Sequence, residues 1–258
     1  MSEFPIGIFD SGIGGLTIQK KINNFLPNEN LVYYSDSFNS PYGNKSGQEL
    51  DEICFNNCEF LINKKCKLIV VACNTATTNC IKKLRSKFNI PFVGVEPAIK
   101  PAAKRTKSGK IGVLATEGTL RSKQFNNISE IHTKNIKVIE ENAKGLVELI
   151  ERGIFKGQDL RLILLKHLNQ MIEMGIDQLV LGCTHFPLII DEIKKIIPPK
   201  ISILESSDAV AKQTKRVLKE NNLIKNEGIG NTTFYCNGPT TSLNKILNYN
   251  FEIIRIKI

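Results

Sequence analysis

Two stretches of the chain share one unusual form: an apolar run typical of a buried strand, then a cysteine, then a polar turn that opens a helix. The first is KLIVVACNTATT, residues 67–78, and the second is DQLVLGCTHFPLII, residues 177–190. Short apolar runs that alternate with helices are typical of parallel sheets in α/β proteins. The two stretches therefore predict an α/β fold in which Cys73 and Cys183 follow the carboxyl ends of two strands.

A cysteine at such a strand end has distinctive chemistry. Pro187 favours the first turn of a helix, so Cys183, Thr184 and His185 are expected at a helix N-terminus. Unpaired N–H groups and the helix dipole favour negative charge there. We therefore expect the pKa of the thiol to be lowered, and the neighbouring histidine to exchange a proton with it.

The two stretches also occupy matching places in a longer repeat. IGIFDSGIGGLT begins at Ile6 and KIGVLATEGT begins at Lys110, and each reads as a strand with an Ile-Gly pair followed by a turn. Cys73 lies 67 residues after Ile6, and Cys183 lies 72 residues after Ile111. This matched offset favours an internal duplication over chance similarity.

The duplication predicts two pseudo-symmetric α/β domains with mainly parallel sheets. The first is expected to comprise residues 1–97 plus about 209–258, and the second residues 98–208. The tail, with the strand-like TTFYC (232–236), is assigned to the first domain because the second half already has its strands. Open α/β sheets bind ligands at the carboxyl ends of their strands. We therefore expect the active site in the cleft between the two domains.

Composition argues against several other classes of protein. The net charge is +10, but the lysines are spread over predicted helix faces and the chain lacks Trp, so we expect a solvated basic surface and no nucleic-acid partner. No apolar run approaches the roughly 20 residues needed to cross a bilayer, and the N-terminus lacks the features of a signal peptide. We therefore expect a cytoplasmic protein without membrane contact. Seven cysteines, an odd number, predict free thiols and no disulfide framework.

Further polar residues follow the predicted strands at the same edge. Asp10 and Ser11 precede a turn whose glycines, at positions 12, 14 and 15, do not match the dinucleotide fingerprint GxGxxG. The loop after the second strand contains SPYGNKS and presents Tyr42 and the Gly43 amide. Since no cofactor motif accompanies these residues, we expect chemistry without a cofactor.

The residues alone leave several uses open for two such thiols. A redox couple usually has its cysteines close together, as CxxC, whereas these are 110 residues apart. A cysteine hydrolase needs one thiol and a histidine, which leaves the second cysteine stretch without a purpose. A zinc protein would use Cys73, Cys183, His185 and Asp10, but the hydroxyl and amide groups beside them are poor zinc ligands and good carboxylate binders.

Proton transfer is the remaining use. One thiol removes a proton from a carbon atom, and the other returns a proton to the opposite face, which inverts the centre. Two chemically equal groups suit this reaction because it must run in both directions. Cys73 and Cys183 are the two groups that the sequence offers for it.

Four motifs in order, DSGIGG, SPYGNKS, ACNTATT and GCTHFPLI, make the whole chain resemble the glutamate racemases of the cofactor-independent aspartate/glutamate racemase superfamily. The resemblance implies a cytoplasmic bacterial isomerase that interconverts L- and D-glutamate without a cofactor or metal. It also implies a supply of D-glutamate for peptidoglycan, and hence for cell-wall biogenesis and cell shape. We expect a homodimer. Aspartate racemases share the two-cysteine plan and stay as an alternative, although the PYG and CNTAT context fits glutamate better.

The same resemblance assigns roles to individual residues. Cys73 and Cys183 resemble the two acid/base cysteines of the family, Asp10 and His185 their assisting groups, and Glu151, in ELIERG, a further acidic residue near the second thiol. The family's substrate-binding positions are matched by Asp10, Ser11, Pro41, Tyr42, Gly43, Asn74, Thr75, Thr184 and His185. One departure is that many members carry Ala-Arg shortly before PYG, where this chain has Phe38-Asn39. The departure concerns the mouth of the cleft and not the chemistry.

Overall fold

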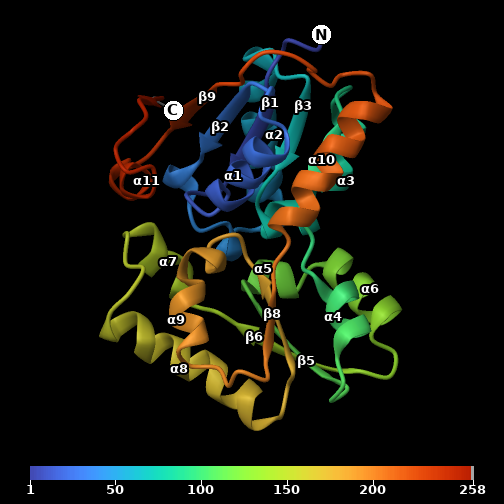
Figure 1. The fold of residues 1–258 in the computed structure, drawn as a ribbon, viewed down its shortest axis with the longest axis vertical. Coiled ribbons are helices and arrows are strands. Elements are labelled where there is room, and N and C mark those ends of the chain that lie inside the picture. Colours follow the sequence, from blue (N-terminus) through green and yellow to red (C-terminus); the bar gives the residue numbers. More distant parts are fainter. Residues whose placement is uncertain (257–258) are drawn as a thin grey trace.

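The computed structural model describes residues 1–256 and contains two parallel sheets, one in each half of the molecule (Figure 1). The six-stranded sheet has the order β10-β9-β2-β1-β3-β4 and is built from β1 (Ile6–Asp10), β2 (Leu31–Ser35), β3 (Leu68–Val71), β4 (Phe92–Gly94), β9 (Thr232–Cys236) and β10 (Ile253–Arg255). The four-stranded sheet has the order β6-β5-β7-β8 and is built from β5 (Lys110–Ala115), β6 (Lys137–Asn142), β7 (Gln178–Gly182) and β8 (Ser202–Leu204). Every strand pair is parallel, which confirms the predicted fold class.

The two sheets share one strand order. The first four strands of each half are arranged as β2-β1-β3-β4 and β6-β5-β7-β8, so the first strand of each half lies between the second and third. The register agrees as well, because Phe9 pairs with Val71 and Leu114 pairs with Leu181. Each cysteine follows the third strand of its half, two residues after Val71 or Leu181. Cys73 and Cys183 therefore occupy equivalent positions in the two halves.

Helices cover both faces of the sheets and surround the six-stranded sheet at the top of Figure 1 and the four-stranded sheet at the bottom. The helices of the upper half are α1 (Leu16–Phe25), α2 (Gly47–Asn63), α3 (Asn74–Lys87), α10 (Ser207–Glu220) and α11 (Thr241–Ile246). Those of the lower half are α4 (Ile99–Arg105), α5 (Glu117–Leu120), α6 (Lys123–His132), α7 (Leu146–Glu151), α8 (Gln158–Glu173) and α9 (Ile190–Lys194). Three short 3₁₀ turns are η1 (Ser37–Asn39), η2 (Tyr42–Asn44) and η3 (Phe186–Ile189).

The tail after α10 returns to the upper sheet, where β9 pairs with β2 and β10 pairs with β9. Without β9 the inner strand β2 would be a sheet edge with unpaired backbone groups. The return is held by Glu29, whose buried carboxylate accepts the N–H of Lys225 at 2.8 Å and forms an ion pair with Lys67. The chain passes between the halves after β4 and after β8 (Figure 1). The exact domain limits at residues 97/98 and 208/209 stay a prediction.

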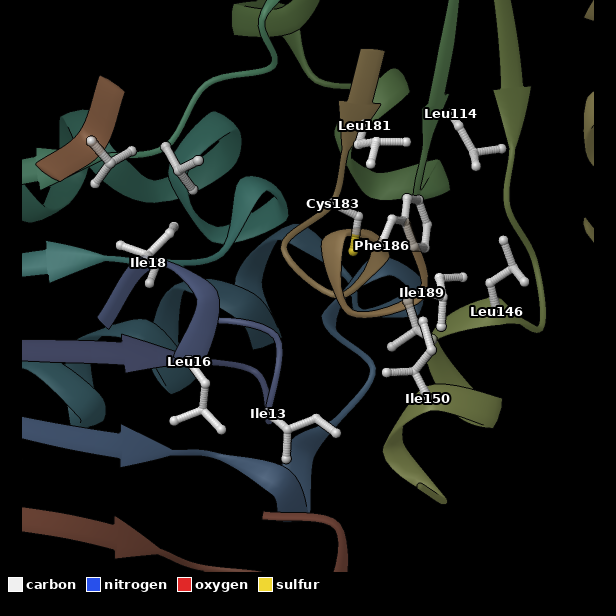
Figure 2. Packing of buried hydrophobic residues seen from close by; sticks show 14 of the residues in the cluster. Ile13, Leu16, Ile18, Leu114, Leu146, Ile150, Leu181, Cys183, Phe186 and Ile189 are labelled. Atoms are coloured by element: carbon white, nitrogen blue, oxygen red, sulfur yellow. The ribbon is translucent and has the colours of Figure 1, made fainter. Parts of the chain in front are cut away.

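An apolar core continues from one half into the other around the loop that carries Cys183. The central strands β1, β2 and β3 of the upper sheet are buried along their whole length, as expected for a parallel sheet covered on both faces. Figure 2 shows Ile13 and Leu16 on one side of this loop and Leu146 and Ile150 on the other, with Phe186 beside the cysteine. The halves are therefore packed against each other, and the strand ends of both sheets meet at this contact. No helix within residues 1–256 is long and apolar enough to span a bilayer.

Candidate active site

Both cysteines line one small cavity between the two sheets. Its walls are formed by Ser11, Pro41, Tyr42, Gly43, Cys73, Asn74, Thr75, Thr116, Val147, Cys183 and His185. The volume is about 10 Å³, which is room for about one water molecule. The structure therefore brings the two equivalent strand ends together in a closed site.

Cys73 lies between β3 and α3, where it is the N-cap residue of a 14-residue helix. Its sulfur lies 3.8 Å from the Ser11 hydroxyl. Burial raises the pKa of the Cys73 thiol, and the negative charge of Asp10 raises it further, while the Ala76 N–H and the Ser11 hydroxyl oppose the shift. Sequence reasoning predicted a lowered pKa for a thiol at the strand-to-helix junction of Cys183, and at the equivalent Cys73 the helix end does not have this effect. The cause is that complete burial outweighs the favourable helix end.

Cys183 has a different local structure although its position is equivalent. It is followed by the four-residue 3₁₀ turn η3, which contains Pro187 and leads into the short helix α9. The Cys183 sulfur lies 3.6 Å from Nδ1 of His185. The helix expected after Cys183 thus begins as a 3₁₀ turn and continues as the short α9, and a histidine stands beside the thiol.

His185 is buried between the Cys183 thiol and the carboxylate of Glu151. Its Nε2 lies 2.5 Å from Oε1 of Glu151. Burial by itself lowers the pKa of His185, but the Cys183 sulfur and the Glu151 carboxylate together raise it well above its ordinary value. The imidazolium is therefore the stable form, with one N–H directed at the carboxylate and the other at the sulfur.

Glu151 comes from the last turn of α7 and reaches the first glycine turn of the other half. Its Oε1 also accepts the backbone N–H of Ile13 at 2.8 Å. A Cβ atom at Gly12 would lie 1.8 Å from the same oxygen, so only glycine leaves room for the carboxylate. Glu151 therefore holds His185 and the turn of the upper half at the same time.

Asp10 is fully buried at the end of β1. Its Oδ2 accepts the N–H groups of Gly12 and Gly15 at 3.2 and 3.0 Å, and its Oδ1 accepts the hydroxyl of Thr184 at 3.2 Å. Burial raises the pKa of the Asp10 carboxyl to about 6, although the charge of His185 and the Gly15 N–H act in the opposite direction. Asp10 is thus mostly ionised at neutral pH, and it lies behind the cavity wall and not on its surface.

The polar residues predicted from the sequence divide into those that line the cavity and those that support it. Ser11, Pro41, Tyr42, Gly43, Asn74, Thr75 and His185 belong to the lining, while Asp10, Glu151 and Thr184 do not. Thr184 lines a neighbouring cavity instead and holds Asp10. Their individual roles in binding and catalysis stay predictions.

Two lining residues were missed by sequence reasoning. Thr116 follows β5 as Ser11 follows β1, and its hydroxyl lies 2.8 Å from that of Thr75 in the other half. The repeat contains the signal that identifies it, because the two first strands align and each is followed by a hydroxyl residue. Val147 is the other, and nothing in its local sequence singles it out.

A metal centre has no support in the geometry of the described chain. Among residues 1–256, no group of three or more His, Cys, Asp or Glu side chains is placed to hold a metal ion. The combination of Cys73, Cys183, His185 and Asp10 considered for zinc is therefore not a ligand set in this conformation.

Comparison with known proteins agrees with the geometry of the site. The model of the Asp/Glu/hydantoin racemase family matches residues 20–214. A glutamate racemase of Clostridium perfringens is 40% identical over 259 residues, which cover 100% of this chain and 98% of that protein. The chain spans the length of such relatives.

Solved structures show the same similarity. The crystal structure of the glutamate racemase isoform RacE1 from Bacillus anthracis has a TM-score of 0.87 at 30% identity, covering 100% of this chain and 98% of that one. The Escherichia coli glutamate racemase, in complex with L-glutamate and the activator UDP-MurNAc-Ala, has a TM-score of 0.84 at 31% identity over 97% of each chain. An aspartate racemase of Picrophilus torridus, at 18% identity and a TM-score of 0.55, shares the fold alone. The chain belongs to the Asp/Glu/hydantoin racemase family.

Proposed function

We propose that this chain is a glutamate racemase, an isomerase that interconverts L- and D-glutamate by moving a proton between two thiols at Cα. The observation that carries the proposal is that Cys73 and Cys183 line one cavity from equivalent strand ends. Full-length similarity to glutamate racemases supports glutamate as the substrate over aspartate, since the aspartate racemase is a distant neighbour. No cofactor is proposed.

The reaction needs one thiolate and one thiol on opposite faces of the substrate carbon. The thiolate takes the proton from Cα and becomes a thiol, and the second thiol gives its proton to the opposite face and becomes a thiolate. The enzyme thus ends one turnover with the proton on the other sulfur. We assign Cys73 to the D enantiomer and Cys183 to the L enantiomer, as the family resemblance implies.

The neighbours of each sulfur suit these two states. Nδ1 of His185, 3.6 Å from the Cys183 sulfur, is placed to exchange a proton with it. Buried Cys73 faces the carboxylate of Asp10 and is held as a thiol. We therefore propose that the closed resting enzyme carries its transferable proton on Cys73, and that Asp10 and His185 assist the first and second thiol.

Substrate recognition is proposed for the remaining lining groups. The hydroxyls of Ser11, Thr75 and Thr116, with the Asn74 amide and the backbone N–H groups of the turns, can donate hydrogen bonds to the two carboxylates of glutamate. Thr184 is proposed to bind substrate once the cleft opens, although its hydroxyl is given to Asp10 in the closed form. Asp10 is likewise proposed to bind the substrate ammonium group once the cleft opens, although it lies behind the cavity wall in the closed form.

Glutamate cannot enter the site as it stands. A cavity of about 10 Å³ is far smaller than the several hundred Å³ of an ordinary small-molecule site. Opening must separate the two halves and break the contacts between Thr75 and Thr116 and between Ile13 and Glu151. We infer that the cavity is the closed state of a cleft that opens for substrate and product.

The wider role proposed for the chain follows from its relatives. We infer that it supplies D-glutamate for peptidoglycan in a bacterial cytoplasm, and so contributes to cell-wall biogenesis and cell shape. We also infer a homodimer, which light scattering of the purified protein tests directly. A monomer at the protein concentration of the activity assay would contradict the homodimer and leave the proposed reaction untouched.

The decisive experiment is incubation of the purified protein with D-glutamate in deuterated water. Proton NMR should show loss of the α-hydrogen signal, and circular dichroism should show loss of optical activity. Neither change should occur with Cys73→Ser or Cys183→Ser. No change in either signal for the wild type would overturn the proposal. In that case, exchange with aspartate, a covalent adduct seen by mass spectrometry, or stoichiometric zinc by metal analysis would select an alternative.

A further inference from the structure

A further buried carboxylate lies outside the groups that surround Cys73 and Cys183. Asp36 follows β2 and is fully buried, and four neutral side chains donate hydrogen bonds to it. These donors, together with Asp36, form what we call the Asp36 network: Asn39, Tyr42, Asn57 and Asn237. Buried carboxylates without such partners are costly, so this arrangement needs every donor in place.

The Asp36 network holds the phenol of Tyr42. The Tyr42 hydroxyl donates to Oδ2 of Asp36 and accepts from Nδ2 of Asn57 at 2.7 Å. The donor and one acceptor position of the hydroxyl are thus used inside the network, while Tyr42 lines the cavity together with Pro41 and Gly43. The Tyr42 hydroxyl is therefore a point of attachment for the cavity wall.

Asn237 brings the C-terminal part of the chain into the same network. It lies directly after β9, and its Nδ2 donates to Asp36 and, at 2.9 Å, to the hydroxyl of Tyr34. Its Oδ1 accepts the backbone N–H of Phe38 at 3.0 Å. A Cβ atom at Gly238 would lie 2.8 Å from that same Phe38 nitrogen, so the tail is in close contact with the segment that leads to the cavity wall.

The segment from Ser37 to Asn44 has no α-helix or strand of its own. It consists of two three-residue 3₁₀ turns, neither of which has a side-chain cap, and Phe38 at its start is 68% exposed. Short 3₁₀ turns have poor hydrogen-bond geometry and depend on their surroundings. The Asp36 network supplies these surroundings from α2 through Asn57 and from the tail through Asn237.

We propose that Asn57 and Asn237 are positioning residues for substrate binding, which hold the Pro41–Gly43 wall of the cavity through Asp36 and Tyr42. The C-terminal segment, although remote from both thiols in sequence, is thereby a determinant of substrate affinity. This inference rests on the proposed racemase function for its kinetic consequence, while its structural consequence is independent of substrate. Neither asparagine takes part in proton transfer.

The test combines kinetics with a double-mutant cycle. In Asn237→Ala, KM for both enantiomers should rise about tenfold while kcat changes less than threefold, because the wall is displaced but the thiols are not. Tyr42→Phe removes the hydrogen bond by which the network holds the wall, so adding Asn237→Ala to it should raise KM by clearly less than the tenfold expected in the wild-type background. Additive effects in the double variant would overturn the inference, as would a KM within twofold of wild type in Asn237→Ala.

The chain offers a matched control at the other end of β9. Asn231 precedes β9, is exposed, and uses its side-chain oxygen only for the N–H of the next residue, so Asn231→Ala should leave KM unchanged. Asn57→Ala is a second arm that reaches the network from α2. It should reproduce the rise in KM if Asn237→Ala proves too unstable to assay.

Amide hydrogen exchange provides a readout that does not depend on activity. In the substrate-free Asn237→Ala protein, a peptide covering residues 37–45 should exchange faster than in wild type, whereas peptides that contain Cys73 or Cys183 should not. Unchanged exchange in residues 37–45 would overturn the inference even if the racemase function holds. If the wild-type protein fails to racemise glutamate but Asn237→Ala still speeds exchange in residues 37–45, the proposed function is removed and the positioning network stays in place.

Discussion

Cys73 with Asp10, and Cys183 with His185, form two thiol clusters that have the same place in their sheets and opposite electrostatic surroundings. Each cysteine follows the third strand of its half in the same register. Cys73 faces a carboxylate, Asp10, whereas Cys183 faces an imidazolium, His185. Equivalent backbone positions therefore place one sulfur beside a carboxylate and the other beside a histidine that is paired with Glu151.

The difference arises at a few equivalent positions of the repeat. Two residues after each cysteine stands Thr75 in one half and His185 in the other. The end of the first strand carries Asp10 in one half, and Ala115 in the other. The second half obtains its carboxylate from elsewhere, through Glu151 on α7. The shared strand order thus places the two sulfurs, and the differences at these positions set the charges beside them.

The strongest test of the comparison is removal of each thiol. Cys73→Ser and Cys183→Ser should each lower kcat for racemisation by more than a thousandfold, since a serine hydroxyl is far too weak an acid to replace a thiol. Circular dichroism with each enantiomer measures the rates, and the far-ultraviolet spectrum shows whether the fold is kept. A folded variant with a tenth of wild-type activity would show that one thiol is enough and that the two clusters are not equal partners.

The cost of the negative charge beside Cys73 can be measured as a stability. Because the pKa of Asp10 is about 6 in the folded protein and 3.8 without the fold, its stabilising effect is complete below pH 3.8 and is lost as the pH rises through 6. Asp10→Asn should therefore raise the free energy of unfolding at pH 8 relative to wild type, by up to about 3 kcal/mol, with the gain shrinking towards pH 4, while kcat falls. Urea unfolding at several pH values measures this, and a gain that does not depend on pH would contradict it.

The positive charge beside Cys183 can be removed with His185→Gln. Loss of the imidazolium should lower kcat about a hundredfold, because the Cys183 thiolate loses its neighbouring cation. The deuterium isotope effect at Cα should increase more with L-glutamate than with D-glutamate, since Cys183 is assigned to the L enantiomer. Equal increases for both enantiomers would show that His185 serves both clusters.

The contact that joins the two clusters is tested through a glycine. Gly12→Ala places a methyl group against Glu151, so the carboxylate should lose Ile13 and His185 and kcat should fall about tenfold. Gly47→Ala is the matched control, because a Cβ atom there meets nothing within 4 Å. If both variants keep wild-type activity, Glu151 is not needed to orient His185.

Local sequence determined the framework of the site. The apolar runs before Cys73 and Cys183 predicted two buried parallel strands, because burial on both faces requires continuous apolar residues. The polar residues that follow these strands were placed at one edge for the same reason, and the matched offsets of the two halves predicted their pairing in space. These features depend on neighbours in the chain, so they can be read without a structure.

Tertiary structure decided the charges and the closure of the site. At Cys73 the helix end does not lower the pKa, because burial, a property of the whole fold, outweighs it. Glu151 contacts Ile13 and His185, and Thr116 contacts Thr75. No local sequence pattern predicts these contacts. Protonation depends on which distant groups share a dry, low-dielectric space. The sequence therefore determined which residues could take part, and only the packing of the two halves decided which of them share the buried site.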